Sequence, residues 1–301
     1  MASIKMHPDE IQADLSLVRQ LIAAQFPQWA NLPLQSLESA GTSNIIYRLG
    51  TEMMVRLPRT LGSVSQLGKE QRWLRQLAPY LPLAIPIPLG HGTPSETYPY
   101  PWSVYRWIEG DDATYEPIFN LHEAAIALGR FVAALQKIDP TQGPPAGEHN
   151  FFRGVPLESL DAVVRKTLES LEGLIDVLAA TAAWETALKV PPWKGPLRWI
   201  HGDLHAGNLL VRNSKLVAVI DFGGLGVGDP ACDMMAAWTY FSSETRKTFQ
   251  TEVGVDDSTW ARGRGWALYL GVVALPYYQQ SNPVLASIAR QTIAEVLADQ
   301  E

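Results

Sequence analysis

Short polar clusters interrupt the otherwise apolar stretch Ile200–Met235, and they constrain the fold more than any other feature of the chain. The segments 208–211 and 216–220 are rich in strand-forming residues, and the Arg-Asn-Ser-Lys sequence between them is typical of a turn. This pattern predicts a β-hairpin. Such a hairpin would carry Asn208 at one base and Asp221 at the other, close enough for the two side chains to share a metal ion.

The polar residues around this hairpin have the spacing of a phosphoryl-transfer site. His201-Gly202-Asp203 precedes Asn208 with the pattern H-x-D-x-x-x-x-N, which resembles the catalytic loop of protein kinases, and Asp221 opens a D-F-G sequence. Transfer to an alcohol needs a base and metal ions that neutralise phosphate charge. Asp203 is therefore the predicted base, with Asn208 and Asp221 as oxygen ligands of Mg²⁺. His201 is predicted to orient the loop through hydrogen bonds rather than to titrate.

Two neighbouring features were weighed against this prediction. His201, Asp203 and His205 could form a zinc cluster as in a metal-dependent hydrolase, but no further His or Cys spacing supports it and it leaves the D-F-G unexplained. Asp229, followed by Pro230, and Asp233 open the next segment, and both are predicted to cap a helix and to support the metal-binding loop, with Asp229 as the N-cap.

Composition narrows the class of partner. The chain has 301 residues and a formal net charge of −7, from 24 basic and 31 acidic side chains, which argues against nucleic acid and is compatible with a cationic acceptor. The single cysteine, Cys232, excludes an internal disulfide framework. We expect a cytoplasmic protein without a membrane partner, because no leader-like or long apolar segment is evident. A monomer and a homodimer both stay open.

The N-terminal third reads as a helix, a sheet and a second helix. Apolar spacing predicts a helix over 8–26, strands over 34–37, 45–49 and 53–57, and a helix over 64–78. The polar turn Gly41–Asn44, with Ser43, is a candidate for contact with phosphate oxygens. Arg56 on the third strand is the predicted phosphate-binding cation, and Glu70 on the following helix is its predicted partner. Arginine in place of lysine changes the geometry, because it forks rather than acting as a point charge.

A lobe boundary is expected after the strand-like segment 102–108. Backbone groups near Arg106 and Ile108 are predicted to bind the edge of the nucleotide base. We therefore expect an N-terminal nucleotide-binding lobe over 1–108 and a C-terminal catalytic and acceptor-binding lobe over 109–301. The proline-punctuated segment 83–89 is not expected to form a regular central strand. Helices are predicted over 120–138, 157–190 with a break near 172–173, 230–241, 258–278 and 283–298.

Taken together, these motifs resemble the aminoglycoside phosphotransferase family, the antibiotic kinases related to protein kinases. The resemblance rests on HGDLHAGNLLV, IDFGG and GDPACDMM, with VRLPR, the helix of Glu70 and WSVYRWIEG upstream, and it spans about residues 37–297. It implies an α+β, two-lobed, protein-kinase-like fold: a small N-terminal lobe with an antiparallel sheet and one packed helix, and a larger, mainly helical C-terminal lobe. It also implies ATP or GTP as cosubstrate, Mg²⁺, and O-phosphorylation of a small molecule.

The acceptor is less constrained than the reaction. The resemblance favours an aminoglycoside or similar antibiotic, hence a role in antibiotic resistance. A macrolide phosphotransferase, a metabolic kinase for an amino alcohol or sugar, and a non-catalytic nucleotide-binding protein stay open. Carboxylates that could meet ammonium groups are Glu244, Asp256 and Asp257, and aromatic candidates for an acceptor pocket or for the core are Trp238, Tyr240, Trp266, Tyr269, Tyr277 and Tyr278.

Overall fold

The fold is that of a computed structural model, which describes residues 11–37, 44–115, 118 and 120–299. The chain divides into two compact units, residues 1–79 with 84–109 and residues 80–83 with 110–301. No helix within the described ranges is both long and apolar enough to cross a membrane.

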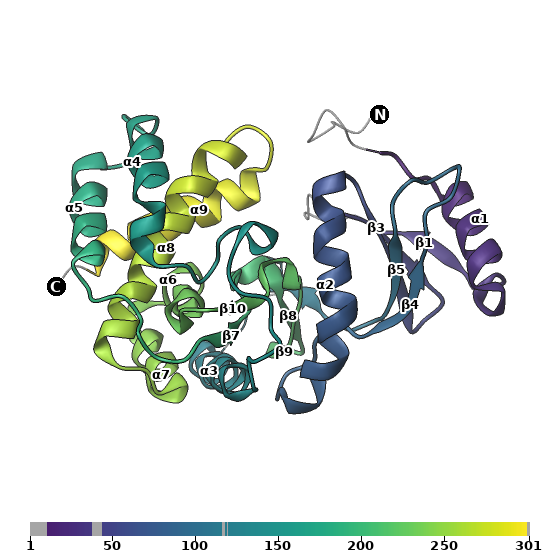
Figure 1. The fold of residues 1–301 in the computed structure, drawn as a ribbon, viewed down its shortest axis with the longest axis horizontal. Helices are drawn as coiled ribbons and strands as arrows, with labels where there is room; N and C mark the ends of the chain where they lie inside the picture. The colour runs from purple at the N-terminus through teal and green to yellow at the C-terminus, as the bar shows by residue number, and fades with distance from the viewer. Residues whose placement is uncertain (1–10, 38–43, 116–117, 119, 300–301) are drawn as a thin grey trace. The chain divides into compact units, whose positions relative to one another are not determined.

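The first unit is an antiparallel sheet with a helix on each face. Its strands are β1 (Leu34–Ser36), β2 (Asn44–Leu49), β3 (Met53–Pro58), β4 (Pro88–Gly92) and β5 (Trp102–Arg106), in the spatial order β1-β2-β3-β5-β4. Helix α1 (Leu15–Gln25) covers one face and helix α2 (Leu61–Leu77) the other (Figure 1). The predicted sheet and its packed helix are confirmed, and α1 adds a second helix to this layer.

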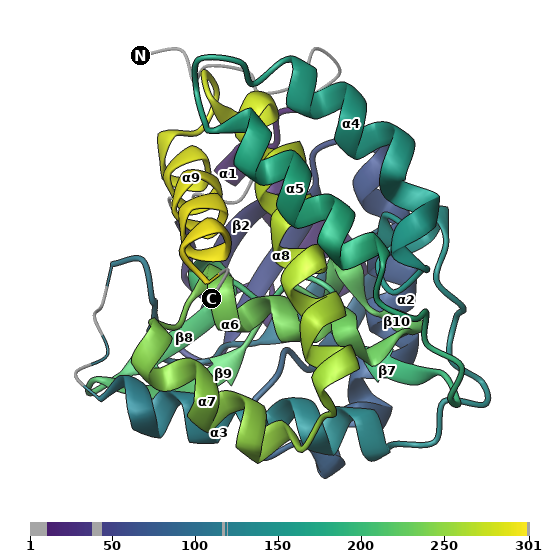
Figure 2. The same cartoon turned by 90° about the vertical axis from the view of Figure 1, so that its left-hand side faces the viewer.

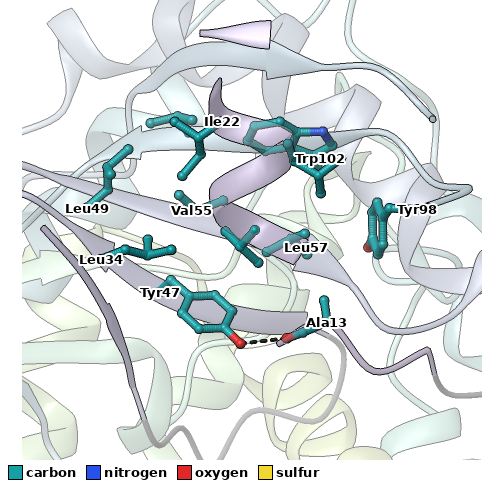
Figure 3. Close-up of a cluster of buried hydrophobic side chains, with 12 residues drawn as sticks. Ala13, Ile22, Leu34, Tyr47, Leu49, Val55, Leu57, Tyr98 and Trp102 are labelled. Carbon is teal, nitrogen blue, oxygen red and sulfur yellow. Dashed lines mark hydrogen bonds between the residues drawn. The ribbon is translucent and has the colours of Figure 1, made fainter. Parts of the chain in front are cut away.

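Alternation along the central strands gives the two faces different chemistry. Val55 and Leu57 point into the apolar cluster under α1, together with Trp102 of β5 (Figure 3). Arg56, between the two apolar residues of β3, points to the opposite face and contacts Glu70 of α2. Because side chains alternate between the two faces of β3, the charged pair lies on the face covered by α2 and the apolar core on the face covered by α1.

The first helix is shorter than the apolar spacing predicts. Asp14 is its N-cap, and the carboxylate accepts a hydrogen bond from the Leu17 N–H at 2.8 Å. Residues 11–14 are therefore not helical, and the predicted residues 8–10 lie outside the described part of the chain. As predicted, the proline-rich segment does not form a central strand: β4 begins at Pro88 and lies at the edge of the sheet, where proline is tolerated.

The second unit is mainly helical and carries two small sheets. Its helices are α3 (Leu121–Lys137), α4 (Asp161–Glu169), α5 (Val177–Leu188), α6 (Ala236–Thr239), α7 (Ser243–Val253), α8 (Asp257–Tyr278) and α9 (Pro283–Ala298). The sheets are β7 (Arg198–Ile200) with β10 (Gly226–Gly228), and β6 (Asp111–Asp112), β8 (Leu209–Arg212) and β9 (Lys215–Val219) in the order β6-β8-β9. Figure 2 shows α8 and α9 packed side by side, with α7 beside α3. The predicted hairpin is β8–β9, and the predicted helices over 120–138, 258–278 and 283–298 are present.

Two C-terminal segments differ from the prediction. The predicted helix over 230–241 is a 3₁₀ segment, Pro230–Met235, followed by the short α6. Every residue of the 3₁₀ segment is buried, so packing against α8 rather than a one-sided apolar stripe determines its path. Helix α7 was not predicted, because Phe249 is the one large apolar side chain among its buried residues and the buried Arg246 instead pairs with Glu295 of α9.

A buried ion pair ties α8 to the segment that precedes the 3₁₀ turn. Arg262 Nε donates to Asp229 Oδ2 at 2.7 Å and Nη2 donates to Oδ1 at 3.2 Å. The same carboxylate accepts the Ala231 N–H at 2.9 Å, so Asp229 is the N-cap that its sequence context predicts. Both charged side chains are almost fully buried, and each therefore depends on the other for compensation.

Replacing Arg262 with Met should lower the free energy of unfolding by about 3–5 kcal/mol, because it leaves the Asp229 carboxylate buried without its cation. Urea unfolding would measure the loss. The matched control is Arg165→Met, which breaks an exposed pair with Asp161 and should cost less than about 1 kcal/mol. Equal losses in the two variants would show that the buried pair contributes no more than a surface one.

Candidate active site

Two short antiparallel strands bring the predicted catalytic clusters together. Strand β7 pairs with β10 in a register that sets Ile200 opposite Gly226. The loop from His201 begins where β7 ends, and the D-F-G segment ends just before β10. The loop after β7 passes close to the D-F-G segment at Gly202. This residue has φ +82°, and a Cβ there would lie 2.6 Å from the carbonyl oxygen of Gly224. Glycine is therefore required at the centre of the loop.

The side chain of Asp233 binds the backbone of this loop through two hydrogen bonds. Its Oδ2 accepts the His201 N–H at 2.8 Å, and its Oδ1 accepts the Gly202 N–H at 2.8 Å. Burial raises the pKa of Asp233 to about 7, and the charge of Asp203 acts in the same direction, while the two backbone donors oppose the rise. The support that Asp233 gives to this loop is predicted, but as a helix cap rather than through hydrogen bonds to the backbone before Asp203. Its position four residues after the capping Asp229, inside an otherwise apolar segment, was the available signal.

His201 is fully buried, and both of its ring nitrogens have partners. Nε2 lies 3.1 Å from the carbonyl oxygen of Ile220, and Nδ1 accepts the Asp203 N–H at 3.2 Å. These partners fit the neutral tautomer with its proton on Nε2. Burial lowers the pKa of His201 to about 4. The ring thus joins the catalytic loop to the residue before Asp221, an arrangement that favours the orienting role predicted for it.

Asp203 and Asn208 are in direct contact. Asn208 Nδ2 donates to the backbone oxygen of Asp203 at 2.8 Å and to its Oδ2 at 3.2 Å. His205 Nε2 lies 3.7 Å from the same Oδ2, and His205 Nδ1 accepts the Gly207 N–H at 3.1 Å. Burial raises the pKa of Asp203, but His205, Arg153 and His201 outweigh it and leave the pKa below its ordinary value. The carboxylate is therefore ionised at neutral pH.

The hairpin sets Asn208 beside Asp221, as predicted. Leu209 pairs with Val219, and the Ile220 N–H donates to the Asn208 carbonyl at 2.9 Å. Asp221 has φ +58°, a left-handed conformation that is uncommon outside glycine and that turns the chain at the base of the hairpin. Because the Asn208 amide nitrogen faces Asp203, its Oδ1 remains for a cation, and one amide and one carboxylate oxygen are a donor set that suits Mg²⁺.

The alternative zinc cluster is not supported. No group of three or more His, Cys, Asp and Glu side chains within the described ranges is arranged to hold a metal ion. The His201 nitrogens in particular are already engaged by Ile220 and by the backbone of Asp203.

The predicted cation–glutamate pair lies in the first unit. Arg56 Nη1 donates to both carboxylate oxygens of Glu70, at 2.9 and 2.8 Å, and the Tyr105 hydroxyl donates to Glu70 Oε2 at 2.6 Å. With its amide oxygen turned toward Arg56, Asn44 accepts from Nη2 and Nε at 2.9 and 3.0 Å. The sequence indicated Asn44 only as part of a phosphate-contacting turn, not as a partner of Arg56, and it gave no sign of Tyr105. Only the strand register, which sets these residues next to β3, brings them to Glu70 and Arg56.

Some of the remaining predicted residues are available to a ligand, and others are already engaged in the fold. The N–H of Arg106 donates to the Ile87 carbonyl at 2.9 Å, whereas the N–H of Ile108 makes no hydrogen bond to any described residue. Ser43 lies outside the described residues. Of the acidic acceptor candidates, Asp256 caps α8 through the Thr259 N–H at 2.7 Å, and Glu244 and Asp257 lie in the first turns of α7 and α8. Among the aromatic candidates, Trp238 and Trp266 are core residues, and Tyr277 is exposed.

Replacing His201 with Gln should reduce stability more at pH 7.5 than at pH 4.5. The pKa of His201 is depressed in the folded chain, so the unfolded chain binds more protons between about pH 6.5 and 4. The contribution of His201 is therefore complete above pH 6.5 and falls by up to about 3 kcal/mol as the pH drops to 4. Urea unfolding of both proteins at each pH measures it, with the exposed His91→Gln as control. A stability difference independent of pH would contradict the buried neutral imidazole.

Comparison with known proteins agrees with this architecture. The sequence profile described as "Phosphotransferase enzyme family" matches residues 36–266. A search of curated proteins finds no matching relative. The GDP and kanamycin complex of APH(2")-IIia is a solved structure 20% identical to this chain, with a TM-score of 0.71 and coverage of 94% of this chain and 99% of the other.

Two further solved structures are similar over nearly their full length. The GDP complex of wild-type aminoglycoside 2'-phosphotransferase-IIIa is 18% identical, with a TM-score of 0.71, covering 96% of this chain and 100% of the other. Macrolide 2'-phosphotransferase MphH from Brachybacterium faecium is 20% identical, with a TM-score of 0.63, covering 96% and 99%. At these identities the likeness shows a shared fold. With the family profile matching most of its length, the chain belongs to the phosphotransferase enzyme family and is an enzyme of the kinase type.

Proposed function

We propose that this protein is a small-molecule O-phosphotransferase that moves the γ-phosphoryl group of ATP or GTP to a hydroxyl. The observation that carries the proposal is the cluster of Asp203, Asn208 and Asp221, fixed by one hairpin and by the carboxylate of Asp233. Solved structures with this fold include complexes with GDP, ADP and ATP. The expected lobes, nucleotide-binding over 1–108 and catalytic and acceptor-binding over 109–301, remain part of this proposal.

Asp203 positions the acceptor hydroxyl and receives its proton. Its pKa lies below the ordinary value, so the carboxylate is ionised at neutral pH and accepts a hydrogen bond from the hydroxyl. The acceptor oxygen forms a bond to the γ-phosphorus while the bond to the nucleoside diphosphate breaks, and the hydroxyl proton passes to Asp203 and then to solvent. A weakly basic carboxylate suits a loose transition state, in which the nucleophile needs orientation more than early deprotonation.

Asn208 and Asp221 would hold Mg²⁺ through their side-chain oxygens. When bound, the ion neutralises charge on the phosphate oxygens. The hydrogen bond from the Asn208 amide nitrogen to Asp203 fixes which atom faces the cation, since it leaves Oδ1 on the other side of the amide. One side chain thus links the position of the base to that of the metal ligand.

In the first unit, Arg56 would hold the donor phosphates and Glu70 would fix its guanidinium. The pair is buried, and Tyr105 and Asn44 complete its hydrogen bonding. The backbone N–H of Ile108 is the donor best suited to the base edge, because that of Arg106 is already engaged.

Replacing Asp203 with Asn should lower kcat by about 100- to 10,000-fold, because the amide keeps the shape but cannot take up the proton. Nucleotide affinity should stay unchanged. The measurement is nucleoside diphosphate release over a panel of aminoglycosides, macrolides, amino alcohols and sugars, with titration of the nucleotide alongside. The exposed Asp139→Asn is the control, and full turnover in the Asp203 variant would exclude it as the base.

Replacing Arg56 with Lys should raise KM for the nucleotide about tenfold with little change in acceptor KM. A lysine has a single nitrogen in place of the planar fork that engages Glu70 and Asn44 through separate nitrogens, so the cation loses its fixed orientation. Initial rates at varied nucleotide and varied acceptor separate the two constants. A rise confined to the acceptor KM would remove Arg56 from the nucleotide site.

A further inference from the structure

The loop Gly147–Gly154 is fastened onto the catalytic segments of the second unit. Asn150, which is fully buried, accepts the Gly147 N–H at 2.9 Å and donates to the backbone oxygens of Arg153 at 2.9 Å and Gly224 at 3.4 Å. The Gly154 carbonyl accepts the Asp229 N–H at 2.8 Å. Both ends of the loop are therefore held against the D-F-G segment and the strand that follows it, and the position of Arg153 is fixed.

The side chain of Arg153 runs along the catalytic loop. A Cβ at Gly202 would lie 3.0 Å from Arg153 Cβ and 3.1 Å from Cγ, so the stem packs directly on the residue before Asp203. The guanidinium carbon then lies 5.5 Å from the ring centre of Tyr269 on α8. The stem therefore lies next to the residue that precedes Asp203, and Arg153 is one of the groups whose charge lowers the pKa of that carboxyl.

Arg153, which is partly buried, differs from the buried arginines of this chain in forming no ion pair with a described carboxylate. Arg56, Arg246 and Arg262 each form an ion pair with a carboxylate. Arg153 Nε is buried without a hydrogen-bond partner, and its guanidinium makes no ion pair with any described residue. A partly desolvated guanidinium is costly unless a ligand compensates it, and its planar fork matches a carboxylate or a phosphate.

The elements that hold Arg153 point to the acceptor rather than to the metal. The predicted metal ligands come from the β8–β9 hairpin, whereas Arg153 reaches Asp203 from the 147–154 loop and rests on α8. Phe151 and Phe152 precede it with left-handed backbones, φ +57° and +59°, and about half of each side chain is exposed. Such strain in consecutive aromatic residues is typical of binding sites.

We propose that Arg153 binds an anionic group of the acceptor, a carboxylate or phosphate carried near the reacting hydroxyl, and that it disfavours an ammonium group there. The assignment rests on the proposed function, because Asp203 defines where the hydroxyl binds. It narrows the acceptor from the aminoglycoside class toward hydroxy acids and phosphate esters of alcohols. The carboxylates that the sequence suggested for ammonium groups lie instead at helix N-termini, where Asp256 serves as a cap.

Acceptors with one carbon skeleton and different charge test this assignment. Glycerate and glycerol phosphate supply the two anions, glycerol is neutral, and aminopropanediol is cationic. The wild-type enzyme should show kcat/KM for at least one anion about ten- to a hundredfold above that for glycerol, the factor expected of a charge-assisted hydrogen bond, and lowest for aminopropanediol. In Arg153→Gln the preference should disappear, chiefly through KM, and Arg153→Lys should recover part of it. The exposed Arg165→Gln should leave it unchanged.

The rate of nucleotide hydrolysis without acceptor separates this role from others. It would fall in Arg153→Gln if Arg153 served the fold in general or bound the phosphoryl group. It should be the same in wild type and in Arg153→Gln, and near-ultraviolet circular dichroism should show the same fold. Equal loss for hydrolysis and for all acceptors would overturn the proposal and place Arg153 on the phosphoryl group. A wild-type preference for glycerol or aminopropanediol, or no binding of either anion by calorimetry with nucleoside diphosphate and Mg²⁺, would also overturn it. Failure of nucleotide binding itself would count instead against the proposed function.

Discussion

The carboxylate of Asp233 is the constraint on which the catalytic loop depends. It accepts the N–H groups of His201 and Gly202, both at 2.8 Å, at the point where the chain leaves β7. Without it these two buried donors would lose their partners, a loss of about 1–3 kcal/mol each. The turn of the loop requires glycine at position 202, because a Cβ there would lie 2.6 Å from the carbonyl oxygen of Gly224. Asp233 and Gly202 together direct Asp203 toward Asn208, so the position of the proposed base depends on two residues outside the proposed catalytic set.

Asp233 and His201, which meet at this loop, change the stability of the fold with pH in opposite directions. Burial raises the pKa of Asp233 to about 7, so the folded chain holds a proton that the unfolded chain releases, and this group lowers stability as the pH rises from about 4 to 7. Burial lowers the pKa of His201 to about 4, so that group raises stability over about pH 4 to 6.5. In the shared range the two contributions oppose each other. A buried acid and a buried base next to each other thus reduce the pH dependence that either would impose alone.

The parts of the candidate site that depend on spacing within one segment can be predicted from the sequence. The turn between 208–211 and 216–220 predicts the hairpin, and the hairpin sets Asn208 beside Asp221 without further information. The contacts of Asn44, Tyr105 and Asp233 were not predicted, because they depend on strand register or on packing between distant segments. Helix α7 was missed for the same reason: it buries Arg246, whose compensation comes from Glu295 on another helix.

Three arginines of this chain differ in how their positive charge is compensated. Arg262 is matched by Asp229 and Arg56 by Glu70, so each pair is electrically closed before any ligand arrives. Arg56 nevertheless retains a fixed fork, because Asn44 and Glu70 hold its nitrogens from two sides. Arg153 has a fixed stem on Gly202 and an open charge beside Asp203. In a chain with 31 acidic and 24 basic side chains, carboxylates are available to pair with it. No described carboxylate forms an ion pair with Arg153, so the proposed anionic group of the acceptor would complete the compensation of this cation.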